Sequence, residues 1–236
     1  MKTLVSIVSV EEALEVAEGG GDIVDIKNVE EGSLGASFPW VIRGVIAASG
    51  GRNMTFSATL GDLPYKPGTA ALAALGASAC GVQFVKAGLF GVRNYGEALE
   101  VMSAVVLTCR NENPRTRVVA AGYADYRRFG GIDAQTLVRV AHDAGADLVM
   151  VDTSIKDGTT LFDVMSMSEL EDFIAEAHAR GLEVALAGSV RFDHLNHLKR
   201  LGPDVVGVRG CVCSANDRTT KIQAGRVRAF VDAISS

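Results

Sequence analysis

Strand-like and helix-like patterns alternate along the whole chain of 236 residues. Short apolar runs predict strands at residues 4–9, 22–27, 54–60, 82–85, 117–122, 147–152, 183–187 and 204–208. Longer segments predict helices at residues 11–17, 40–48, 69–79, 94–110, 133–144, 168–180, 192–200 and 219–234. The strand runs are almost continuously apolar, which is typical of parallel strands buried on both faces. Eight β and eight α units at this length predict a single α/β domain, a (β/α)8 TIM barrel spanning residues 1–236.

An open, doubly wound sheet is the main alternative. Such sheets often carry a Gly-x-Gly-x-x-Gly turn after the first strand, whereas residues 8–12 read Val-Ser-Val-Glu-Glu. The apolar N-terminal run is short for a signal peptide, and Glu11 and Glu12 follow it where small residues should form a cleavage site. No stretch is long enough to span a membrane, so we expect no membrane partner.

The composition narrows the class of function. Hydrophobic residues make up 48% of the chain, and the net charge of −5 gives no support for a nucleic-acid partner. The four cysteines (Cys80, Cys109, Cys211 and Cys213) match no zinc pattern and are few for a disulfide scaffold. We therefore interpret them as reduced thiols of a cytoplasmic protein and expect no metal site.

The second strand pattern ends in a charged pair, Asp25 and Lys27. Residues two apart on a strand point to the same side, so a carboxylate should lie beside an amine at the strand exit. Burying an ammonium group without compensation is costly, which makes a strand lysine unusual. Two interpretations stay open: a salt bridge that closes the end of the core, or an amine held ready to attack a carbonyl.

Other lysines fall at the same end of the predicted barrel, where barrel enzymes carry their sites. Lys86 follows the fourth strand, Lys66 follows the third, and Asp152 with Lys156 closes the sixth. Amines that converge on one mouth repel each other, which lowers the pKa of at least one of them. A lowered pKa suits a Schiff-base lysine, because the neutral amine is the nucleophile. The alternative is a solvated basic rim that merely binds an anion.

Glycine-bearing turns follow the last two predicted strands and are a second feature of the predicted site. Gly188 and Ser189 follow strand seven, and Arg209 and Gly210 follow strand eight. Loops at these positions often bind phosphate in barrels, because glycine lets backbone N–H groups approach an anion, and arginine can add a bidentate contact. We add Gly122, at the end of strand five, to this predicted phosphate-binding set. The alternative is tight turns that need glycine for backbone reasons alone.

The motifs resemble those of the (5-formylfuran-3-yl)methyl phosphate synthase family, which catalyses the first step of methanofuran biosynthesis. The matching stretches are DIKN at 25–28, EGSLGA at 31–36, FPWVI at 38–42, GDLPYKPGT at 61–69, KAGL at 86–89, AAGYAD at 120–125, KDG at 156–158, LFD at 161–163, AGS at 187–189 and GVRG at 207–210. They are distributed over nearly the whole chain. Val29 is a departure, since archaeal members are expected to carry proline after the lysine–asparagine pair.

The resemblance implies a lyase that condenses two molecules of glyceraldehyde 3-phosphate, with loss of one phosphate and two waters. Lys27 would form the iminium, assisted by Asp25, and Lys86 would shuttle protons. Asp152 and Lys156 would position or protonate the second triose. The glycine loops and the arginine beside them would hold the retained phosphate. No cofactor is implied, because the iminium itself is the electron sink.

Two other functions stay open at this point. An ordinary class I aldolase would form the carbon–carbon bond through the same Schiff base and stop there. A non-catalytic barrel that senses a phosphorylated ligand would use the basic rim without chemistry. In each case we expect a phosphorylated small molecule, a triose in the family reading, as the partner, and we expect the chain to form a homo-oligomer.

Overall fold

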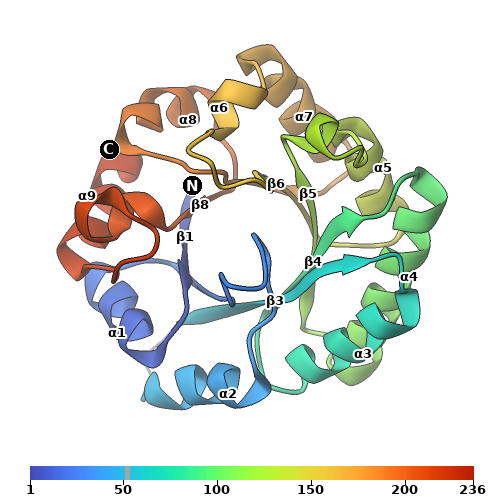
Figure 1. The fold of residues 1–236 in the computed structure, drawn as a ribbon, viewed down its shortest axis with the longest axis horizontal. Coiled ribbons are helices and arrows are strands. Elements are labelled where there is room, and N and C mark those ends of the chain that lie inside the picture. Colours follow the sequence, from blue (N-terminus) through green and yellow to red (C-terminus); the bar gives the residue numbers. More distant parts are fainter. Residues whose placement is uncertain (51–53) are drawn as a thin grey trace.

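Eight parallel strands close into a ring at the centre of the computed structural model, which describes residues 1–50 and 54–236 (Figure 1). The strands are β1 (Lys2–Ile7), β2 (Ile23–Ile26), β3 (Thr55–Pro64), β4 (Phe84–Gly91), β5 (Arg117–Tyr123), β6 (Leu148–Asp152), β7 (Glu183–Leu186) and β8 (Val205–Val208). Each strand pairs with the next along the chain, and β8 pairs with β1. The prediction of a TIM barrel is therefore confirmed.

Helices surround the ring on its outside (Figure 1). They are α1 (Val10–Gly19), α2 (Pro39–Ala48), α3 (Pro67–Ser78), α4 (Tyr95–Glu112), α5 (Ala134–Asp143), α6 (Leu161–Val164), α7 (Met167–Ala179), α8 (Leu195–Leu201) and α9 (Ala224–Ser235). Within the described residues, none of these helices combines the length and the apolarity that a membrane crossing requires.

Alternation along each strand divides the core into two layers. Val5 and Ile7 of β1 pack in the large apolar cluster between the strands and the helices. Leu4 belongs to a smaller cluster inside the ring, together with residues from β2, β4, β5, β6, β7 and β8. Because side chains alternate between faces, polar residues in register with Leu4, such as Ser6, also face the interior.

The helix ends follow local capping chemistry. The hydroxyl of Ser9 accepts the N–H of Glu12 and caps α1, so Ser9 starts a helix and does not end the strand predicted at 4–9. Asp133 caps α5 in the same way. Ser166 starts α7, two residues before the serine that the sequence favoured, because Glu169 completes a reciprocal capping box with it.

The segment after β8 departs most from expectation. The helix predicted at 219–234 begins only at Ala224, and two short 3₁₀ helices, Gly210–Val212 and Ser214–Asn216, precede it. β4 extends to Gly91, six residues beyond the predicted end at 85. The four-residue helix α6 was not predicted, because one turn carries no readable periodicity.

The segment between β2 and α2 turns into the middle of the ring (Figure 1). Leu34 from this segment is fully buried in the inner apolar cluster. The carbonyl of Gly35 accepts hydrogen bonds from the N–H of Asn28 at 2.9 Å and from Thr59 Oγ1 at 2.6 Å. Ser33 Oγ reaches across to the carbonyl of Thr153 at 2.9 Å. The segment therefore closes part of the barrel mouth.

Candidate active site

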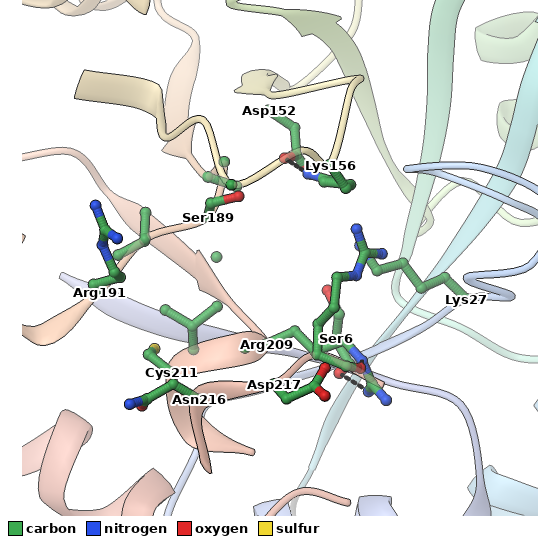
Figure 2. Close-up of a pocket in the computed structure, with 18 of the residues that line it drawn as sticks. Ser6, Lys27, Asp152, Lys156, Ser189, Arg191, Arg209, Cys211, Asn216 and Asp217 are labelled. Carbon is green, nitrogen blue, oxygen red and sulfur yellow. Dashed lines mark hydrogen bonds and ion pairs between the residues drawn. The ribbon is translucent and has the colours of Figure 1, made fainter. Parts of the chain in front are cut away.

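A cavity of about 410 Å³ opens at the C-terminal ends of the strands (Figure 2). Its walls come from the ends of β1, β2 and β6 and from the loops after β6, β7 and β8. Among the described residues, none from β3 or β4 lines it. The site is therefore displaced toward the half of the ring that contains β6, β7, β8 and β1, and the segment that carries Ser33 and Leu34 borders it at Lys27.

Lys27 projects into this cavity just beyond the end of β2. Its Nζ donates a hydrogen bond to the carbonyl of Ser33 at 3.0 Å. Burial lowers the pKa of Lys27 to about 8, although Asp152 and Asp25 act in the opposite direction. Lys27 therefore carries a substantial neutral fraction near neutral pH, unlike an ordinary lysine.

Burial is the main cause of this shift in pKa. From the sequence we expected repulsion between amines to cause a lowered pKa. Lys86 and Lys156 do lower the pKa of Lys27, but they contribute less than burial. The segment that supplies the Ser33 carbonyl is also the one that closes the mouth beside the amine. The lowered pKa of this lysine thus depends mainly on its burial.

Asp152 and Lys156 form an ion pair on another wall of the cavity (Figure 2). Lys156 Nζ lies 2.7 Å from Asp152 Oδ1 and 3.1 Å from Thr153 Oγ1. Burial alone would raise the pKa of Asp152, but Lys156 and Lys27 outweigh burial and lower that pKa to about 2. The pair therefore presents a fixed carboxylate and an adjacent ammonium group to anything bound at Lys27.

Asp25 pairs with Lys86 and, in the described structure, makes no hydrogen bond to Lys27. Lys86 Nζ lies 2.7 Å from Asp25 Oδ2, and the two side chains are 1% and 0% exposed. Ser6 Oγ donates to the same carboxylate oxygen at 2.9 Å. Neither Lys86 nor Asp25 lines the cavity. The structure thus places two of the five predicted catalytic residues beneath the site, behind its wall.

Arg209 lines the cavity, but its guanidinium is occupied by other protein groups. Nη1 and Nη2 bind the two carboxylate oxygens of Glu12 at 2.8 and 3.1 Å. Nη1 also binds the carbonyl of Ser6, and Nε binds that of Arg218. With four of its five N–H donors committed in this way, Arg209 has little left to offer an anion, and this geometry gives no support to its predicted role as a phosphate ligand.

The turn after β7 forms part of the cavity wall through Gly188 and Ser189. Gly188 has a φ of +114°, and Ser189 has a φ of +48°, a left-handed conformation that is uncommon for a residue with a side chain. A Cβ atom at Gly188 would lie 2.9 Å from Thr153 Cγ2 and 3.1 Å from the backbone nitrogen of Thr153, so the turn needs glycine there. Gly210 lines the same cavity from the turn after β8.

Two predicted phosphate ligands lie elsewhere. A Cβ atom on Gly122 would lie 2.6 Å from Leu137 of α5, so Gly122 faces the outer helices and allows close packing there. Lys66 is exposed at the start of α3 and does not line the cavity. The structure therefore does not bring either residue to the site.

Arg218 is a cavity residue that the sequence analysis missed. It lies in the irregular segment before α9, directly before the stretch where a helix had been predicted. Its guanidinium makes no hydrogen bond or ion pair with any residue in the described ranges 1–50 and 54–236. Burial lowers the pKa of Arg218, while Asp152 acts in the opposite direction. Arg218 thus supplies the cavity with a cation that has no protein partner in those ranges.

Asp62 is a second missed residue. Its carboxylate accepts the N–H of Leu34 at 3.1 Å and the hydroxyl of Tyr123. Burial raises the pKa of Asp62. Gly32 and Gly88 leave room for its oxygens, since a Cβ atom at either position would lie within 2.7 Å of them. Asp62 therefore anchors the segment that closes the mouth over the inner cluster.

The cavity combines a buried amine, a carboxylate–ammonium pair, two glycine-bearing turns and an arginine that forms no ion pair with the described residues. A neutral amine can add to a carbonyl, and a paired carboxylate and ammonium can move protons beside the adduct. An arginine beside turn N–H groups can hold an anionic oxygen cluster. Within the described residues, no group of three or more acidic, histidine or cysteine side chains is placed to bind a metal ion.

The fold and this lysine-bearing mouth define the class of protein, a (β/α)8 TIM barrel with a basic cavity at the C-terminal ends of its strands. KGPDC from Streptococcus mutans superposes with a TM-score of 0.69 at 14% identity, over 99% of this chain and 96% of that one. The chain belongs to the 4-HFC-P synthase family, whose model matches residues 3–231. The resemblance noted from the motifs is therefore confirmed.

Two relatives that match this chain over almost their full lengths are both named (5-formylfuran-3-yl)methyl phosphate synthase. The (5-formylfuran-3-yl)methyl phosphate synthase of Methanothermobacter thermautotrophicus is 52% identical over 100% of both chains. That of Archaeoglobus fulgidus is 49% identical over 99% of both chains.

Proposed function

We propose that this protein is a (5-formylfuran-3-yl)methyl phosphate synthase acting in methanofuran biosynthesis through a Schiff base on Lys27. Its substrate would be glyceraldehyde 3-phosphate, of which two molecules are condensed. The observation that carries the proposal is the buried amine of Lys27, with its pKa of about 8, in a cavity beside Asp152 and Lys156. Membership of the family supports the product, and the chemistry of the cavity supports the route.

In the first step, the neutral Nζ of Lys27 adds to the aldehyde carbon of one triose phosphate, and loss of water leaves an iminium. The positive nitrogen withdraws electrons from the neighbouring carbon, so the proton on C2 can be removed and the phosphate on C3 can leave. Condensation with the second triose, ring closure and loss of two further waters give the furan, and hydrolysis of the iminium takes up one water and frees Lys27. Two C₃ aldehydes thus lose one phosphate and two waters in total.

Asp152 and Lys156 would serve the leaving groups. The ammonium of Lys156, held by Asp152 at 2.7 Å, can donate a proton to a departing hydroxyl or phosphate oxygen. The carboxylate of Asp152 stays ionised, because its pKa lies near 2, and it stabilises the cationic iminium through space.

The retained phosphate would be held by Arg218 and by the backbone of the turns that carry Ser189 and Gly210. Arg218 makes no ion pair in the described part of the chain, and all three residues line the cavity. Arg209 would contribute indirectly, because its contact with the carbonyl of Arg218 at 2.9 Å fixes the backbone beside the anion site.

Incubation of the purified protein with glyceraldehyde 3-phosphate as the sole substrate tests the proposal. We expect a product whose mass equals two trioses less one phosphate and two waters, with the ultraviolet absorbance of a furan aldehyde. Borohydride should trap substrate on Lys27, and Lys27→Arg should abolish both trapping and turnover, because guanidinium stays protonated. An aliphatic six-carbon product would indicate an ordinary aldolase, and binding without trapping would indicate a sensor.

A further inference from the structure

Lys86 and Asp25 form a buried ion pair that the cavity does not reach. Their side chains are almost completely buried, and neither one lines the cavity wall. Asp25 Oδ1 has no hydrogen-bond partner in the described part of the chain, although it is fully buried. A buried carboxylate oxygen without a hydrogen bond is costly, so its presence calls for an explanation. Direct contact with a bound triose does not explain it, because Asp25 does not line the cavity.

Ser6 connects this pair to the cavity. It lies directly opposite Asp25 in the register between β1 and β2, and its Oγ donates to Asp25 Oδ2 at 2.9 Å. Ser6 also lines the cavity, as Lys27 does. On the other flank of Asp25, Ser57 of β3 is in register as well, but it does not line the cavity.

We propose that Ser6 is a catalytic proton relay between a triose bound at Lys27 and the buried carboxylate of Asp25. This inference rests on the proposed function. As the C2–H bond of the iminium breaks, its electron pair moves into the new C2–C1 double bond and neutralises the nitrogen. Ser6 Oγ takes the C2 proton and passes its own hydroxyl proton to Asp25. The iminium cation and the carboxylate thus become a neutral enamine and a neutral acid, and the reverse transfer returns the proton.

The arrangement gives the reaction proton-transfer groups on two sides. In Figure 2, Ser6 lies on the opposite wall of the cavity from Asp152 and Lys156. Asp152 Oδ1 already accepts hydrogen bonds from Lys156 and from the N–H of Thr153, and we assign this pair to the leaving groups. Asp25 has an oxygen without a hydrogen bond in the described part of the chain, and Lys86 holds its carboxylate in place from outside the cavity.

The variants Ser6→Ala, Ser6→Thr and Ser57→Ala test the relay. Ser6→Ala should lose roughly 10²–10⁴-fold in kcat, the usual range for proton-transfer catalysis, while borohydride still traps substrate on Lys27. The kinetic isotope effect with triose deuterated at C2 should rise, because proton removal becomes rate-limiting. Ser6→Thr keeps a hydroxyl and should recover most of the activity. Ser57→Ala is the matched control and should stay within about threefold of wild type, since Ser57 Oγ has no hydrogen-bond partner in the described ranges to lose.

The wild-type protein provides a measurement that does not depend on whether a variant folds. The C2 proton is bound to carbon and does not exchange with solvent, so D₂O labels only the hydroxyl proton of Ser6. If the two protons move together, turnover of triose deuterated at C2 should slow further in D₂O, in proportion to the deuterium content. The absence of a solvent isotope effect with this substrate would overturn the relay. Ser6→Ala turnover within threefold of wild type would also overturn it. Failure of wild-type protein to be trapped at Lys27 would instead overturn the proposed function, so the two failures are distinguishable.

Discussion

The guanidinium of Arg209, after the last strand, donates two hydrogen bonds to the carboxylate of Glu12 on the first helix, with N–O distances of 2.8 and 3.1 Å. The two side chains are only 8% and 6% exposed. Glu12 also accepts the N–H of Val8 at 2.9 Å, at the turn between β1 and α1. This buried ion pair thus joins the first and the last βα units of the chain, where β8 pairs with β1 and closes the barrel.

Glu12→Gln should lower the free energy of unfolding by about 3–5 kcal/mol, because it leaves the buried guanidinium of Arg209 without a counter-charge. Urea denaturation followed by circular dichroism measures the change. Glu171→Gln is the matched control, since it breaks the solvent-exposed pair of Glu171 with Arg200 and should cost about 1 kcal/mol or less. Equal losses in the free energy of unfolding would show that the buried pair of Glu12 and Arg209 stabilises the fold no more than an exposed pair does.

Arg218→Ala should raise KM at least about tenfold with a smaller fall in kcat, because a phosphate contact made in both ground and transition states stabilises both. Arg218→Lys should recover part of the loss, since a point charge replaces a planar donor pair. Lys66→Ala is the control, and it should leave KM within about twofold because Lys66 lies outside the cavity. A larger effect at Lys66 than at Arg218 would move the anion site to the start of α3.

The rate of borohydride trapping should rise with pH through an apparent pKa near 8, as the amine of Lys27 loses its proton. Lys156→Met removes a cation that lowers the pKa of Lys27 and should move the rising limb to higher pH. Asp152→Asn removes an anion that raises this pKa and should move the limb to lower pH. Displacement of both variants in the same direction would contradict the electrostatic arrangement.

The same lowered pKa makes stability depend on pH. Between pH 8 and the ordinary lysine value of 10.5, the unfolded chain holds a proton on Lys27 that the folded chain has lost. The folded protein therefore gains stability as pH rises through this window, and the cost of burying the charged amine is greatest below it. Lys27→Met should stabilise the fold at pH 7 by roughly 1–3 kcal/mol, with the difference shrinking toward about pH 10. A difference that is independent of pH would place Lys27 in water.

Gly35→Ala should cost at least about 2 kcal/mol of stability and most of the activity. A Cβ atom there would lie 2.1 Å from the carbonyl oxygen of Asn28, so the segment that holds Ser33 against Lys27 would have to shift. Gly76→Ala is the control. It lies within α3 with no described atom within 4 Å of the added carbon, and should stabilise the protein by about 0.5–1 kcal/mol. Full activity in Gly35→Ala would separate the segment from the reactivity of Lys27.

The alternation of apolar runs predicted the barrel, because each strand of a closed parallel sheet must be buried on both faces. It also predicted that Lys27, Asp152 and Lys156 share one mouth, since the ends of parallel strands lie at one end of the ring. The level of each residue within the ring was harder to predict. Lys86 was assigned to the rim because strand four was expected to end at residue 85, whereas β4 continues to Gly91 and leaves Lys86 deep inside.

Partners that are distant in the sequence were beyond prediction. Nothing near Arg209 indicates that its counter-ion lies 197 positions earlier, at Glu12. Without that partner, an arginine in a glycine-bearing turn resembles a phosphate ligand. Arg218 carried no signal in the sequence, because the segment between β8 and α9 forms short turns whose shape depends on tertiary contacts. Asp62 was part of a recognised motif but had no visible task until Leu34 and Tyr123 were placed beside it.

The segment that carries Ser33 and Leu34 also bears on when, during folding, Lys27 would acquire its lowered pKa. Lys27 owes its lowered pKa mainly to burial, and this segment covers the mouth beside it and supplies the carbonyl that binds its amine. A partly folded chain in which the strands have paired, but the segment with Ser33 and Leu34 is still solvated, would carry an ordinary, protonated Lys27. Such a nascent chain would be protected from aldehydes in its surroundings, and its nucleophile would be unmasked only when the last piece of the mouth is seated.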